Sequence, residues 1–234
     1  MFISVCIISS IFHINLLYYF IDARMDFFSD KTSCFDEGYL ELILGPMFSG
    51  KTTELIRIYK TFDYIGQTPV VINYSGDTRY STTHLSSHDE IKLPCIFTDS
   101  LYRLIDDERV KASSVILINE GQFFGDLHYA VLELVETHKK KVYICGLDGD
   151  FKQRQFGTIL NLIPHCDKVV KLKSLCAICK NGKPAIFSHR VSKETTQVVI
   201  GVNNYIPLCR SCYNNENKVA DNEVSSVASI ETEC

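Results

Sequence analysis

The stretch that most constrains this chain is Gly45-Pro46-Met47-Phe48-Ser49-Gly50-Lys51-Thr52, which fits the G-x-x-x-x-G-K-[ST] pattern of a phosphate-binding P-loop. The spacing has a physical reason. The two glycines let backbone N–H groups turn toward phosphates, Lys51 reaches the β- and γ-phosphates, and Thr52 offers its hydroxyl to Mg²⁺. The motif therefore predicts a nucleotide-binding loop.

The residues on either side support the motif. Residues 39–44 (YLELIL) read as a buried strand, and residues 53–60 (TELIRIYK) carry apolar side chains at helical spacing. The loop would then lie between a strand and a helix N-terminus, where anions are stabilised. A chance match in a glycine-containing turn is the alternative, and it does not account for the flanking strand and helix.

Length and composition limit the size of the fold, the partners and the cellular compartment that this chain can have. A chain of 234 residues with 46% hydrophobic content can form one α/β domain with a small appendage. Its net charge of −4 gives no overall basic field for nucleic acid. Six of the ten cysteines are scattered and four form two C-x-x-C pairs, a usage that suits a reducing, cytoplasmic compartment better than a disulfide framework.

The N-terminus is apolar over residues 2–12 and 16–21, which together are nearly long enough to span a bilayer. A signal anchor is one interpretation. However, no basic region precedes the apolar run, and His13 and Asn15 interrupt it. We favour a dispensable extension, with Met25 as the start of the functional protein and no membrane association.

The central part alternates strand and helix patterns. Apolar runs predict strands at 69–74, 93–97, 113–118 and 141–145, and helical patterns cover 99–107 and 126–138. Repeated β-α-β units predict a parallel sheet with helices on both faces. The polar loop 75–90 is long for a connection, which favours a binding segment, and it carries Arg79.

Two strand ends carry further candidates. Asn119 and Glu120 follow the apolar run 113–118. Because an acidic residue at this point in P-loop proteins lies beside Mg²⁺ and the phosphates, Glu120 is a candidate metal ligand or base; a merely exposed glutamate is the alternative. After strand 141–145, Phe151 and Phe156 are placed either to wall a flat base or to pack in the core.

The paired cysteines Cys176, Cys179, Cys209 and Cys212 form C-x₂-C…C-x₂-C, the signature of a structural Zn²⁺ site with four thiolates. The metal would close the ends of loop 180–208. Two redox motifs or a chance arrangement are the alternatives, and neither explains two pairs flanking one loop. We therefore expect four segments: an apolar extension and polar lead-in (1–37), a P-loop α/β domain (38–167), a zinc-binding domain (168–213) and a disordered tail (214–234).

Several motifs occur in one order. Besides the P-loop and the cysteine pairs, they are Asp77-Thr78-Arg79-Tyr80, Ser87-His88-Asp89, Glu120-Gly121-Gln122-Phe123-Phe124, Leu147-Asp148-Gly149 and Tyr205. From about Gly38 to Tyr213 the chain closely resembles the type II thymidine kinases, the cytosolic and large-DNA-virus class. The resemblance implies ATP-dependent phosphorylation of the 5′-hydroxyl of thymidine or deoxyuridine in nucleotide salvage. It also implies a P-loop NTPase-like sheet with a small zinc-ribbon-like domain carrying a lasso loop, and a homotetramer.

The resemblance also implies residue roles. Glu120 would be the general base for the 5′-hydroxyl proton. The ATP phosphates and Mg²⁺ would be held by Gly45, Pro46, Met47, Phe48, Ser49, Gly50, Lys51, Thr52, Arg79 and Asn119. The nucleoside would be bound by Met47, Leu147, Phe151, Phe156, Ser188, Val199, Gly201 and Tyr205. The chain departs from the family where Asn119 stands in place of the usual Asp, and where segment 200–205 lacks a second glycine and is one residue shorter.

Two other functions fit part of the pattern. Another P-loop phosphotransferase or ATPase with a zinc element would keep the P-loop and Glu120. A zinc-containing nucleic-acid-binding module would use the basic region 168–219, which holds nine Lys or Arg against two Glu. Basic charge near a polyphosphate site has a simpler explanation in nucleotide binding, so we expect no nucleic-acid partner.

Overall fold

The computed structural model describes residues 37–76, 84–86, 92–192, 194, 196–198 and 204–217. The chain divides into two units between Glu37 and Gly38, and the fold described here is that of the second. The apolar extension and residues 218–234 lie outside the described residues. Within the described ranges, no helix has the length and apolar character needed to cross a membrane.

A six-stranded parallel sheet forms the centre of the described fold, with strand order β5-β2-β6-β7-β1-β8. Its strands, in chain order, are β1 (Tyr39–Leu44), β2 (Val70–Tyr74), β5 (Ile96–Thr98), β6 (Val115–Ile118), β7 (Lys141–Gly146) and β8 (Lys168–Lys171). The sheet confirms the predicted α/β class. The predicted start of the zinc-binding domain at residue 168 coincides with the first residue of β8, the last strand of this sheet.

The central strands are apolar runs because both faces of the sheet are covered. β6 is buried throughout, and β1 and β7 are buried except at their first residues. Leu42, Ile116 and Ile144 are fully buried in the main core. Each such side chain contributes about 1.5–3 kcal/mol to folding through its removal from water.

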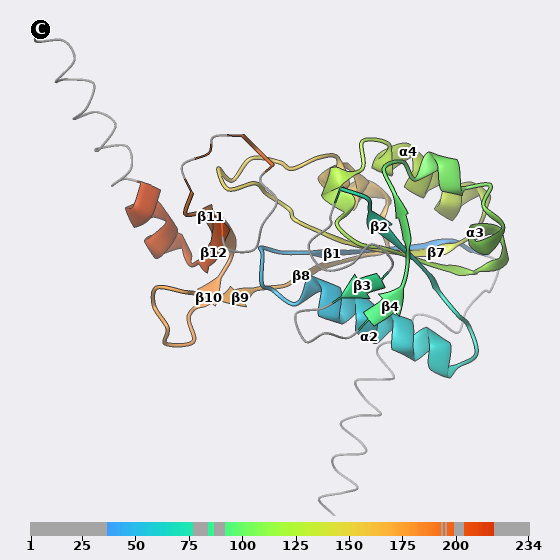
Figure 1. Ribbon diagram of the computed structural model, residues 1–234, viewed down its shortest axis with the longest axis horizontal. Coiled ribbons are helices and arrows are strands. Elements are labelled where there is room, and N and C mark those ends of the chain that lie inside the picture. The colour runs from blue at the N-terminus through green and yellow to red at the C-terminus, as the bar shows by residue number, and fades with distance from the viewer. Residues whose placement is uncertain are drawn as a thin grey trace, which may run out of the picture. The chain divides into compact units, whose positions relative to one another are not determined.

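Helices cover the sheet (Figure 1). The longest in the described part is α2 (Lys51–Tyr64), which lies against one face, while α4 (Leu127–Leu132) and its π-helical continuation η3 (Glu133–Thr137) lie on the other. The shorter turns and helices are η1 (Tyr102–Leu104), α3 (Glu108–Ala112), η2 (Gly121–Phe123) and η4 (Ile159–His165). The β-α-β pattern read from the sequence is thus present.

Two local predictions were wrong. The strand expected at 93–97 is two short strands, β4 (Lys92–Pro94) and β5, and β4 pairs with β3 (His84–Ser86) inside the loop predicted to be irregular. The helix expected at 99–107 is only the turn η1. Asp126 accepts hydrogen bonds from Ser100 Oγ and from the backbone N–H groups of Leu101 and Tyr102, and this capping holds the segment as a tight turn.

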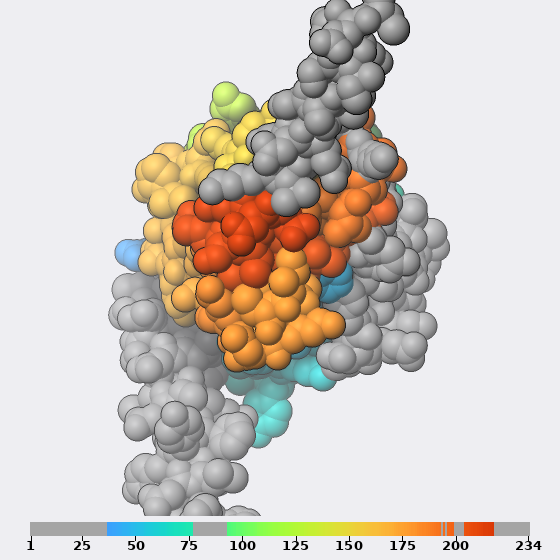
Figure 2. Space-filling view, turned by 90° about the vertical axis from the view of Figure 1, so that its left-hand side faces the viewer, coloured from blue at the N-terminus to red at the C-terminus, as the bar shows by residue number. Residues whose placement is uncertain are grey.

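The cysteine-bearing part follows β8. It contains two small antiparallel sheets, β9–β10 (Ser174–Leu175 with Pro184–Ala185) and β11–β12 (Phe187–Arg190 with Tyr205–Leu208), and residues 210–217 are helical. The helix therefore extends past the start of the predicted tail. In Figure 2 the orange and red segments of this part lie next to one another on one face of the molecule.

Candidate active site

The carboxyl ends of three neighbouring strands bring the predicted site loops together. Leu44 of β1 is in register with Gly146 of β7, and Ile118 of β6 is in register with Ile144 of β7. The P-loop, Asn119 and the loop that begins at Leu147 therefore start at one edge of the sheet. This edge is where open α/β sheets bind ligands.

The P-loop has the predicted strand–loop–helix setting. It leaves β1 at Gly45 and enters α2 at Lys51, with Gly50 in the left-handed conformation (φ 81°, ψ 17°) just before the helix. The buried Lys51 ammonium donates a hydrogen bond to Pro46 O at 2.8 Å. The positive helix N-terminus and the lysine thus face the inside of the same loop.

Ser49 and Gly45 make the loop suited to a phosphate. Ser49 Oγ is buried and has no hydrogen-bond partner among the described residues, so a bound anion would satisfy it. A Cβ at Gly45 would come within 2.8 Å of that hydroxyl and within 2.7 Å of Leu172 O. Because a side chain there would crowd the loop, position 45 requires glycine.

Asn119 is buried and connects three strand ends. Its Oδ1 faces Thr52 Oγ1 at 3.5 Å and accepts a hydrogen bond from Cys145 Sγ at 2.9 Å. Its Nδ2 donates to Asn73 Oδ1 at 2.7 Å. Burial raises the pKa of the Cys145 thiol to about 12, which keeps it protonated as a donor. The hydroxyl of Thr52 and the carbonyl oxygen of Asn119 are the hard oxygen ligands that Mg²⁺ prefers.

Glu120 follows with an unusual backbone. Its φ of 54° and ψ of 44° place it in the left-handed region, which is strained for a glutamate and is often found at functional sites. Its Oε2 accepts a hydrogen bond from Gln122 Nε2 at 2.6 Å. The hydrogen bond from Gln122 therefore holds the orientation of the Glu120 carboxylate.

Gln122 is a site residue for which the sequence reading assigned no role. It is buried, and its Oε1 accepts a hydrogen bond from Leu147 N at 3.0 Å while its Nε2 holds Glu120. The side-chain amide of Gln122 therefore positions both the predicted base and the predicted nucleoside loop. The backbone of Gln122 is also closely packed, since a Cβ at Gly157, whose φ is 60°, would lie 2.1 Å from Gln122 O. The place of Gln122 in the Glu120–Phe124 motif was the available signal.

Ser188, on β11, meets the P-loop. Its Oγ accepts a hydrogen bond from Met47 N at 2.9 Å, across 141 residues of sequence. The side chain is buried, and position 188 pairs with Pro207 of β12. The cysteine-bearing part is thus joined directly to the predicted phosphate loop.

The predicted base-binding aromatics lie in two groups. Phe156 is buried and packs edge-on against Phe123, with ring centroids 5.4 Å apart. Phe151 is half-buried, and the Arg190 guanidinium lies 3.8 Å from its ring centroid and 5.0 Å from that of Tyr205. Arg190 therefore joins Phe151 to Tyr205; the sequence reading gave it no role.

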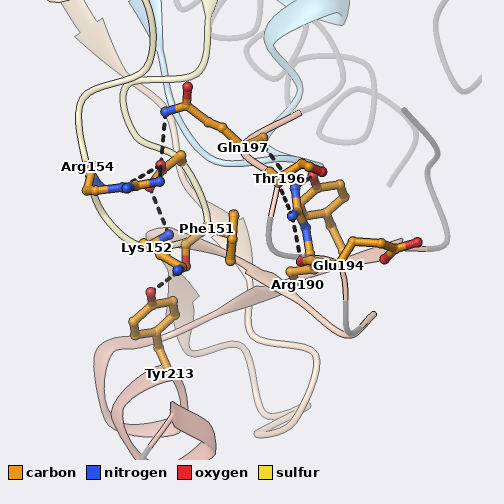
Figure 3. Close-up of polar contacts among 10 residues, drawn as sticks. Phe151, Lys152, Arg154, Arg190, Glu194, Thr196, Gln197 and Tyr213 are labelled. Carbon is orange, nitrogen blue, oxygen red and sulfur yellow. Dashed lines mark hydrogen bonds and ion pairs between the residues drawn. The ribbon is translucent and has the colours of Figure 1, made fainter. Parts of the chain in front are cut away.

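Hydrogen bonds extend this second group (Figure 3). Tyr213 donates from its hydroxyl to Phe151 O at 2.5 Å. Arg190 donates to the backbone carbonyls of Glu194, Thr196 and Gln197 and to the Tyr205 hydroxyl. Of the other predicted residues, Phe48 is exposed, and Arg79, Val199 and Gly201 lie outside the described residues.

The four paired cysteines converge as predicted. The sulfur atoms of Cys176, Cys179, Cys209 and Cys212 all lie within 4.8 Å of one another, with Cys179 Sγ 3.8 Å from Cys209 Sγ and 3.5 Å from Cys212 Sγ. Tetrahedral Zn²⁺ with Zn–S bonds of about 2.3 Å requires sulfur atoms about 3.8 Å apart. Burial opposes ionisation of Cys176, yet backbone hydrogen bonds, first that from Cys179, lower its pKa to about 6. The cluster could hold a metal ion.

Fold and site together define a P-loop α/β protein with a cluster of four cysteines that could hold a metal ion. The sequence profile described as "Thymidine kinase" matches residues 38–213. The chain is 42% identical to "Thymidine kinase" of Raccoon poxvirus over 180 residues, 76% of this chain and 98% of the relative. It is 37% identical to "Thymidine kinase a" of Arabidopsis thaliana over 196 residues, 82% of this chain and 81% of the relative. The chain belongs to the thymidine kinase family.

Proposed function

We propose that this enzyme transfers the γ-phosphate of ATP to the 5′-hydroxyl of thymidine, and also of deoxyuridine, to give the 5′-monophosphate. The observation that carries the proposal is the meeting of the P-loop, Glu120 and the Leu147–Phe156 loop at one sheet edge within a chain of this family. Phosphoryl transfer depends mainly on positioning and charge stabilisation, and we expect the residues at this edge to supply both.

On the phosphate side, Lys51 would exchange its bond to Pro46 O for phosphate oxygens, and Ser49 Oγ would gain a partner, which it does not have among the described residues. Backbone N–H groups of the Gly45–Thr52 loop would add hydrogen bonds at the start of α2. Thr52 and Asn119 would supply oxygen ligands to Mg²⁺, which when bound neutralises charge on the phosphates. We expect Arg79 to add positive charge there.

On the nucleoside side, Glu120 would accept the proton of the 5′-hydroxyl. A general base must be ionised, within hydrogen-bond reach of its proton and fixed in orientation. The bond from Gln122 supplies the fixed orientation, and the same amide binds the backbone of Leu147 next to the predicted base-binding residues. The proton acceptor and the nucleoside loop would therefore keep a constant separation.

The base itself would be held by Met47, Leu147, Phe151, Phe156 and Tyr205, with Ser188 and the backbone near Val199 and Gly201 reading its edge. Aromatic walls and a loop closed over them suit a single-ring base, and a purine would need more room. We also expect Zn²⁺ on the four cysteines, a homotetramer, and a reducing cytoplasmic location that keeps the thiols free.

The test is transfer of labelled phosphate from ATP to a panel of deoxynucleosides. We expect thymidine to be the preferred acceptor, deoxyuridine to be accepted, and deoxyadenosine and deoxyguanosine to be poor. Equal rates with purines would contradict the proposed base site. ATP hydrolysis that ignores added thymidine would instead favour a different P-loop ATPase.

A further inference from the structure

Two loops that the sequence separates are tied by one side-chain hydrogen bond. Gln197, which follows β11, donates from Nε2 to Asp150 Oδ2 at 3.0 Å. Asp150 immediately precedes Phe151, and its carboxylate is fully buried. We call this hydrogen bond the Asp150–Gln197 tie; in Figure 3 the Gln197 and Arg154 side chains reach toward the same carboxylate.

Asp150 is held rigidly on its own loop. Its Oδ1 accepts hydrogen bonds from Lys152 N at 2.8 Å and Arg154 N at 2.9 Å, and its Oδ2 accepts one from Arg154 Nε at 3.0 Å. Burial by itself would raise the pKa of Asp150, but these hydrogen bonds and that from Gln197 lower it below its usual value. The carboxylate is therefore a fixed, ionised anchor.

Gln197 is also held from its other side. Its backbone oxygen accepts a hydrogen bond from Arg190 Nη2 at 3.0 Å, and the same guanidinium lies 3.8 Å from the Phe151 ring centroid. Because Phe151 is bonded to Asp150, the four residues close a ring of contacts. Arg190 also contacts Tyr205. The ring thus fixes two of the aromatic side chains proposed to hold the base.

We infer that Asp150 and Gln197 are positioning residues for the nucleoside: their tie holds Gln197 against the Phe151 loop, so that Phe151 and Tyr205 are in place before the nucleoside binds. Preorganisation of this kind raises affinity because less freedom is lost on binding. The inference rests on the proposed function, since it assigns the tie to thymidine rather than to ATP. The tie should therefore affect thymidine affinity and leave ATP affinity unchanged.

The experiment exchanges the two polar groups in the full-length protein. Q197E places a second carboxylate against Asp150 and should raise the thymidine Kd, measured calorimetrically, about five- to tenfold through repulsion in a partly buried site. In the double variant D150N/Q197E the introduced amide can donate to the introduced carboxylate. Arg154, which loses its Oδ2 acceptor, has an exposed side chain that can turn its guanidinium to the same new carboxylate, so thymidine Kd should recover most of the way to wild type. The Kd of a non-hydrolysable ATP analogue should be unchanged throughout.

Val191→Glu is the matched control. It adds the same charge six residues before Gln197, on a side chain that is 53% exposed, and should leave thymidine Kd unchanged. Equal melting temperatures of Q197E and wild type would exclude general unfolding. Wild-type thymidine affinity in Q197E, or no recovery in the double variant, would overturn the tie. A wild-type protein that binds ATP but no thymidine would overturn the proposed function as well.

Discussion

At the scale of single residues, Gln122 donates a 2.6 Å hydrogen bond to Glu120. Gln122 positions the carboxylate, and Glu120 is the proposed proton acceptor. In E120Q the new side chain can still offer an oxygen to Gln122 Nε2, so the geometry is retained while the basic carboxylate is lost. We expect kcat to fall about 10²-fold or more, because a general base contributes about 10²–10⁴-fold. ATP-analogue Kd should stay near wild type. Turnover close to wild type would mean that Glu120 is not the base.

Asn119 carries the second prediction at this scale. Aspartate at this position would keep an oxygen toward Thr52 and Cys145 and add a full negative charge for Mg²⁺. The lost donor to Asn73 can be replaced, because the Asn73 amide can turn and donate instead. N119D should therefore lower the Mg²⁺ concentration for half-maximal rate several-fold.

A Mg²⁺ titration of N119D and wild type at saturating ATP and thymidine checks this. Superimposable curves would show that Asn119 does not act through the metal. A wild type that is inactive at every Mg²⁺ concentration would show that asparagine disables the site. N73D serves as the control, since it adds a carboxylate one side chain further from Thr52.

Sequence reading named the residues that we propose for the chemistry, and it assigned no role to those that act through geometry. The P-loop and Glu120 could be named because motif spacing reports directly on phosphate and metal chemistry. Gln122, Asn73 and Arg190 could not be assigned roles, because a buried amide or arginine becomes informative only when its partners from distant strands are known. Strain at Glu120 likewise has no signal in sequence composition.

At the scale of elements, β11 is joined to the P-loop by Ser188 Oγ and Met47 N. S188A leaves that N–H without this acceptor and loosens the contact between the two elements, at a cost of about 1 kcal/mol, or roughly fivefold. Because the hydrogen bond joins the P-loop, proposed to bind ATP, to β11, proposed to contact the nucleoside, we expect KM to rise about threefold or more for both ATP and thymidine. Steady-state kinetics with each substrate varied in turn would measure this.

Ser188→Thr is the matched variant, since it keeps the hydroxyl and should restore both KM values. If S188A raised only one of the two KM values, the contact would not act as a joint between the sites. This response differs from that of the Asp150–Gln197 tie, which should alter thymidine binding alone.

Helices and strands were predicted well where the hydrophobic period and the length of the segment indicated the same element. They were predicted poorly where a hydrogen bond from a distant side chain changed the local backbone conformation. Strand β6 is a continuous apolar run, β7 is apolar after Lys141, and β1 is apolar except at Glu41, as largely buried parallel strands require. The stretch 99–107 has helical periodicity, yet Asp126, more than 20 residues away, caps its backbone into a turn. A contact at that separation cannot be read from local pattern.

At the scale of the whole molecule, the four cysteines belong to a hydrophobic cluster that is separate from the core of the large sheet. They have their own small core, formed with Ala185, Leu208 and Tyr213, while the main core lies between the sheet and its helices. We expect one Zn²⁺ per chain. Replacing any one cysteine by serine should loosen this part and raise thymidine KM more than ATP KM, because the P-loop belongs to the sheet.

Metal analysis of protein purified under reducing conditions, together with kinetics of C176S, checks the prediction. Cys166→Ser is the control: Cys166 lies outside the cluster and donates to Ile163 O, a bond that serine can keep. Protein without zinc but with normal thymidine kinetics would contradict it. An equal rise of both KM values would indicate that the damage reaches the sheet.

The left-handed backbone at Glu120 has a consequence for heat tolerance. A glutamate in this conformation costs about 1 kcal/mol relative to glycine, which adopts it freely. The conformation of Glu120, the proposed general base, thus lowers the free energy of unfolding of the protein. Selection for stability alone would favour E120G, which removes the proposed catalytic carboxylate and with it the activity. Engineering for higher temperature should therefore keep Glu120 and add stabilising substitutions in the surrounding sheet.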